Sequence, residues 1–180
     1  MMQKIPFHVP PDASPTSLKA LLTVIDGECK PISRPALLAR MAPYAAARPR
    51  GEAITLAQNL GIVINESNGV VGTRRSHALA HLDCRVDLIH GLQYFAWNDR
   101  APHILTPMWT YRTIIDLIWD EAPVQVTASL KKRMVEEVLE RAKVAFASVQ
   151  GFDSARVSVG PKTVDGVMRW LTELSPPVIK

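Results

Sequence analysis

The sequence predicts a mainly α-helical protein that carries one small β-hairpin near residue 68. Apolar residues recur at helical spacing in several segments of the 180-residue chain, and a period near 3.6 indicates amphipathic helices. The exception is an Asn68-Gly69 dipeptide between the β-branched runs 62–64 and 70–71. Asn-Gly between such runs is the strongest short-range hairpin signal, because both turn positions favour positive φ.

Three helices are expected before the hairpin. The first follows Ser14-Pro15, an N-cap residue with proline at the first helical position, and ends at Gly27. The second covers residues 32–41, and the third begins at Gly51 and ends at Gly61, where glycine readily adopts the left-handed conformation that ends helices. The residues expected to face inward are Leu18, Leu21, Leu22 and Ile25 in the first helix, Leu37, Leu38 and Met41 in the second, and Ala53, Ile54, Ala57 and Leu60 in the third.

This order of three helices and a hairpin over residues 14–73 resembles the winged helix-turn-helix superfamily. The resemblance rests on element order and patterning, and the 42–49 link is longer than the usual 3–4-residue turn of that motif. It implies that the third helix enters the major groove of DNA. Thr55, Gln58 and Asn59 fall on its outward face, and short polar side chains of this kind contact base edges.

Four arginines flank that face in the sequence. Arg48 and Arg50 precede the third helix, and Arg74 and Arg75 follow the hairpin. Phosphate contacts position a protein on DNA while base contacts specify the sequence, so double-stranded DNA is the expected partner. The net charge of +4 permits this partner without requiring it. Glu52 lies within the set and would repel phosphate.

Residues 76–180 are expected to form a helical region, after an extended arm at 1–13 and the winged helix-turn-helix at 14–75. One long helix is predicted over 76–96, another opens at Thr106, and a third is capped by Ser129. A β-compatible segment at 151–159 then precedes a last helix. This ending allows a second, incomplete winged helix. The alternative is a helical subdomain that orders the first module or binds a partner protein. The Pro176-Pro177 terminus is also compatible with a fragment of a longer protein.

His77, His81 and Cys84 lie at i, i+4 and i+7, so one helix face could present all three to zinc. A fourth ligand would have to come from His90 or Cys29. The spacing matches no standard zinc finger, and such side chains also occur where two helices pack together. These residues are therefore weak metal candidates, and no cofactor is expected.

Several classes of function are disfavoured. The chain has no phosphate-binding loop, no dinucleotide-binding glycine motif, no H-E-x-x-H and no G-x-S-x-G, so a non-enzyme is expected. No apolar run approaches the roughly 18 residues of a membrane span. Two cysteines make no disulfide framework, which favours a cytoplasmic protein. The four tryptophans are not interleaved with basic residues, which disfavours single-strand binding.

The leading expectation is a non-catalytic DNA-binding protein, either a transcription regulator or the DNA-contacting subunit of a larger assembly. The alternative is a winged-helix adaptor whose tryptophan-containing second half docks a protein partner. Winged-helix adaptors of this kind occur in bacterial DNA-modification and anti-phage defence assemblies, so the resemblance implies such an assembly as a setting for this chain. A homodimer is compatible with either function, although no heptad pattern specifies one.

Overall fold

A computed structural model of the chain describes residues 5–7, 9, 13–45, 51–96, 106–120, 125–149, 152–153, 155 and 157–174. Of these described residues, 68% lie in helices and 8% in strands, which confirms the mainly helical class. Within these residues, no helix has both the length and the apolar character needed to cross a lipid bilayer. The chain folds as two compact units, one mainly Asp12–His90 and the other mainly Gly91–Thr172 with Met1–Pro11.

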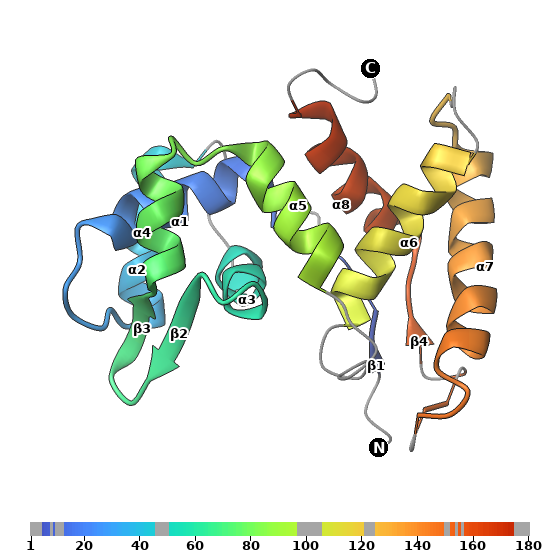
Figure 1. Cartoon of the computed structure of the whole chain (residues 1–180), viewed down its shortest axis with the longest axis horizontal. Helices are drawn as coiled ribbons and strands as arrows, with labels where there is room; N and C mark the ends of the chain where they lie inside the picture. The colour runs from blue at the N-terminus through green and yellow to red at the C-terminus, as the bar shows by residue number, and fades with distance from the viewer. Residues whose placement is uncertain are drawn as a thin grey trace. The chain divides into compact units, whose positions relative to one another are not determined.

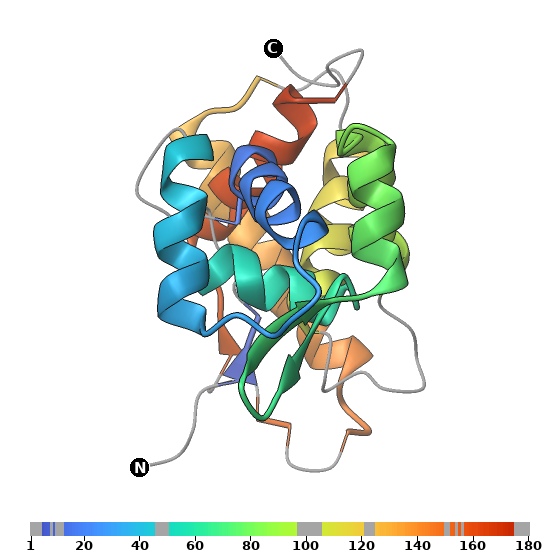
Figure 2. The same cartoon turned by 90° about the vertical axis from the view of Figure 1, so that its left-hand side faces the viewer.

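The first unit contains the predicted three helices and hairpin (Figures 1 and 2). Its elements are α1 (Pro15–Asp26), α2 (Arg34–Met41), the short 3-10 helix η1 (Ala42–Tyr44), α3 (Gly51–Asn59), β2 (Val63–Glu66), β3 (Gly69–Gly72) and α4 (Arg74–His81). The side chain of Ser14 caps α1 by accepting a hydrogen bond from the amide of Ser17 at 3.2 Å. All the residues predicted to face inward are buried except Leu38, which is half-buried.

The hairpin forms where the Asn-Gly signal predicts it, but its turn is shifted by one residue. Glu66 pairs with Gly69, so the two loop residues are Ser67 and Asn68. Asn68 does not have the positive φ that is expected at this turn. Gly69 has φ +147°, and a Cβ there would lie 2.3 Å from the carbonyl oxygen of Ile32. Glycine is needed because Ile32 exchanges two backbone hydrogen bonds with Val70, at 2.8 and 2.9 Å. The hairpin is thereby joined to the segment between α1 and α2.

The prediction of a single helix over residues 76–96 is wrong. The structure has α4, ending at His81, and α5 (Val86–Ala96), separated by a turn. Asp83 and Cys84 adopt positive φ of 54° and 51°, and the Cys84 amide donates to the carbonyl of Leu79 at 2.9 Å. This is how a helix ends in a left-handed turn, here without the glycine that would have signalled it. The helix also starts earlier than predicted, because Thr73 caps it.

The two compact units also differ from the predicted division at residue 75. Helix α4 packs on α1, so it belongs with the first unit, which continues to His90. The predicted extended arm belongs partly to the second unit. There β1 (Ile5–Pro6) pairs in parallel with β4 (Val157–Ser158). Phe7 is fully buried, with its ring centroid 5.6 Å from that of Trp109 and 5.1 Å from that of Phe146.

The second unit contains α6 (Thr106–Asp120), α7 (Ala128–Ala145) and α8 (Pro161–Thr172), as Figure 1 shows. Thr127 caps α7, where Ser129 was predicted, by accepting a hydrogen bond from the Leu130 amide at 3.2 Å. A second, incomplete winged helix in this region stays a prediction. In α8, Thr163 and Trp170 are fully buried, whereas Lys162 and Arg169 are exposed.

Candidate nucleic-acid interface

The outward side of α3 carries the three side chains predicted to contact DNA bases. Thr55 is exposed, whereas Gln58 and Asn59 are half-buried. The opposite side of the helix lies in the core, with Ala53 and Ile54 fully buried. Helical periodicity therefore separates a buried apolar side from an accessible polar side.

Arg34 lies at the start of this polar side, although no pattern in the sequence points to it. Its Nη2 donates hydrogen bonds to the carbonyl oxygen of Gly51 at 2.8 Å and to Oγ1 of Thr55 at 3.0 Å. Arg34 is itself exposed and comes from the first turn of α2. Its charge therefore lies at the N-terminal end of α3, where the helix dipole already favours an anion.

Gln58 connects α3 to the hairpin. Its Nε2 donates to Oδ1 of Asn65, a residue of β2, at 2.5 Å. Both side chains lie at the surface of the unit. A base edge contacted by Gln58 would thus have to replace this hydrogen bond, or use the amide oxygen, which remains an acceptor.

The two arginines after the hairpin differ in their surroundings. Arg75 donates from Nη1 to the carbonyl oxygen of Leu60, so its guanidinium caps the C-terminal end of α3. Arg74 is exposed at the first position of α4. Of this pair, Arg74 is the better placed to meet a phosphate. The other predicted pair, Arg48 and Arg50, lies outside the described residues.

Glu52 opposes the positive charges near α3. It is half-buried in the first turn of the helix, and its Oε2 is buried with no hydrogen-bond partner among the described residues. A carboxylate is favoured by the dipole at this end of a helix. The same charge would repel a phosphate approaching Arg34, so binding here depends on the balance between the two.

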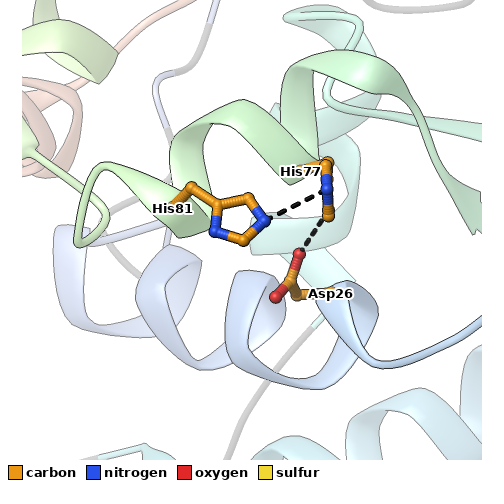
Figure 3. A group of neighbouring side chains, drawn as sticks. All are labelled: Asp26, His77 and His81. Atoms are coloured by element: carbon orange, nitrogen blue, oxygen red, sulfur yellow. Dashed lines mark hydrogen bonds and ion pairs between the residues drawn. The ribbon is translucent and has the colours of Figure 1, made fainter.

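The weak metal candidates are only partly brought together. His77 and His81 are adjacent on α4, with their Nε2 atoms 3.1 Å apart. The thiol of Cys84 does not lie with the two imidazoles in one group of possible metal ligands. Cys84 is 8% exposed, and burial raises the pKa of its thiol. The third member of the group is instead Asp26, at the end of α1 (Figure 3). Sequence spacing could not reveal Asp26, because 51 residues separate it from His77.

Comparison with known proteins gives no further assignment. No protein-family model, no curated protein and no solved structure matches this chain.

Proposed function

We propose that the Asp12–His90 unit is a winged helix-turn-helix that binds double-stranded DNA without catalysing a reaction. In this proposal α3 enters the major groove and the β2–β3 hairpin is the wing. The protein would act in the cytoplasm as a transcription regulator or as the DNA-contacting subunit of a larger assembly.

The observation that carries the proposal is the outward side of α3. It is polar, it is not buried in the core, and Arg34 lies beside Thr55 at its N-terminal end. An anion at this point meets a guanidinium at the positive end of the helix dipole, while Gln58 and Asn59 follow about one turn further along the helix. Candidate phosphate contacts therefore adjoin candidate base contacts, as sequence-specific binding requires.

The hairpin supplies independent support. A wing must hold its position relative to the recognition helix if both are to contact one duplex. Here the backbone of Ile32 bonds to Val70 in β3, and Gln58 bonds to Asn65 in β2. In both views the hairpin extends away from the helices of its own unit (Figures 1 and 2).

Fluorescence anisotropy with a labelled random-sequence duplex at low salt tests the proposal. We expect binding that weakens as salt rises, because contacted phosphates release condensed counterions. Excess unlabelled duplex should displace the labelled duplex in proportion to its concentration. The absence of binding at the lowest salt concentration would contradict the proposal.

A protein-interaction adaptor is the second candidate function. It is favoured by two large aromatic side chains of the second unit, since Phe95 is 76% and Trp119 is 74% exposed. Tryptophan and other aromatic residues are common anchors at protein interfaces. An adaptor should give no shift with random duplex, so the anisotropy experiment distinguishes the two functions.

A further inference from the structure

The two histidines of α4 hold their ring nitrogens in a metal-binding arrangement. Nε2 of His77 and Nε2 of His81 lie 3.1 Å apart, and the two rings are nearly perpendicular, at 89° (Figure 3). Zinc binds imidazole nitrogen at about 2.0–2.1 Å, so two such nitrogens in a tetrahedral site lie about 3.4 Å apart. The ring centroids are only 4.3 Å apart, so the two imidazoles meet edge to face, and an exposed ring must rotate to point both nitrogens at one ion.

Asp26 fixes the orientation of the first histidine. Its Oδ1 lies 2.8 Å from Nδ1 of His77, whereas His81 contacts the other ring nitrogen, Nε2. When Nδ1 donates its proton to this carboxylate, Nε2 of His77 keeps a free lone pair. Histidines that bind metals commonly donate their other ring N–H to a carboxylate, which orients the ring and increases its basicity.

The contact between the two histidines is compatible with a metal ion between them. With His77 protonated on Nδ1, its Nε2 accepts a hydrogen bond, so His81 donates from Nε2. If the proton of His81 moves to its own Nδ1, both Nε2 lone pairs become available without a change in net charge. A divalent ion can then bind to the two lone pairs, and each histidine keeps its own proton on Nδ1.

We propose that His77 and His81 bind a divalent transition-metal ion, zinc in particular, and that Asp26 positions His77 for this purpose. The side chain of His77 is 65% exposed, so water completes the coordination. Because Asp26 belongs to α1 and the histidines to α4, the bound ion reinforces the packing of these two helices.

Calorimetric titration of the whole, EDTA-treated protein with zinc chloride tests the proposal. We expect one ion to bind per chain and the melting temperature to rise with zinc, because a ligand that binds only the native state stabilises it. His77→Gln and His81→Gln should each lose both effects. Asp26→Asn should still bind, but about 10–100-fold more weakly, as expected for a residue that positions a ligand.

Two further variants serve as controls. Cys84→Ser should bind zinc as the wild type does, because the thiol is not in the group, and so should His90→Gln. Circular dichroism in EDTA checks that each histidine variant is folded before titration. If the folded His77→Gln and His81→Gln proteins bind zinc as tightly as the wild type, the proposal is wrong. It is equally overturned if the wild type binds no zinc, or if Cys84→Ser abolishes binding.

Discussion

The guanidinium of Arg75 donates a hydrogen bond to the carbonyl oxygen of Leu60, linking the first turn of α4 to the end of α3. The carbonyls at the end of a helix lack partners within it. Arg75 supplies one such partner, so it has a structural role that the neighbouring Arg74 does not share. The two arginines should therefore be separable by mutation.

Arg75→Ala should lower the free energy of unfolding by about 1.5 kcal/mol or more, because it removes a hydrogen bond made by a charged group. Arg74→Ala should leave stability within about 0.5 kcal/mol of the wild type, as is usual for a surface change, but should weaken duplex binding. Urea denaturation of both variants measures the first effect and anisotropy the second. Equal loss of stability in the two variants would contradict this division of roles.

Gly69→Ala should destabilise the first unit by more than about 1 kcal/mol, because φ of +147° is strained for alanine and the new Cβ meets the Ile32 carbonyl. Gly27→Ala is the matched control. Gly27 has φ −83° and no atom lies within 4 Å of a Cβ placed there, so alanine should be neutral or slightly stabilising. Thermal unfolding of the two variants measures the difference. A Gly69→Ala protein as stable as the control would show that Ile32 does not hold the hairpin as described.

Phe7→Ala should destabilise the second unit by about 3–5 kcal/mol, the usual cost of removing a fully buried phenylalanine. The ring of Phe7 contacts those of Trp109, Phe146 and Phe152, which leaves a large cavity when it is removed. Phe95→Ala should have little effect, because Phe95 is 76% exposed. Tryptophan fluorescence during urea denaturation compares the two. If the Phe7→Ala and Phe95→Ala proteins are equally stable, Phe7 is not part of the folded core of the second unit.

Gln58→Ala should change which sequences are preferred by about 1–3 kcal/mol per altered base pair, if Gln58 contacts a base edge. The measurement is selection from a random duplex library, followed by affinity measurements on the selected sites. Asn65→Ala is the control, because it breaks the same Gln58–Asn65 hydrogen bond while keeping the glutamine. The same change of preference in both variants would indicate that Gln58 acts only by holding the hairpin.

Local patterns predicted much of the first unit. The Ser14-Pro15 start, the apolar spacing of α3 and the Asn-Gly hairpin each depend on residues close in sequence, where intrinsic preferences are informative. The break after His81 could not be predicted in this way. Its left-handed residues are Asp83 and Cys84, whereas glycine is the usual signal.

The features missed in the candidate sites depend on contacts between distant residues. Arg34 lies 21 residues before Thr55 in sequence, so no local pattern connects the two residues. Asp26 replaces Cys84 beside the histidines because the turn after α4 separates the thiol from them, whereas α1 brings the carboxylate close. The two-residue strand β1 is likewise too short to leave a pattern in the sequence.

The salt dependence of duplex affinity in Arg34→Ala and Arg40→Ala tests the proposed role of α3 most directly. Both arginines are exposed on α2, but Arg40 pairs with Glu28, whereas Arg34 lies at the start of α3. We predict that the slope of log affinity against log salt becomes shallower by about 0.9 in Arg34→Ala, one phosphate contact, and is unchanged in Arg40→Ala. Equal slopes for wild type and Arg34→Ala, or no duplex binding by the wild type, would contradict DNA recognition by this surface.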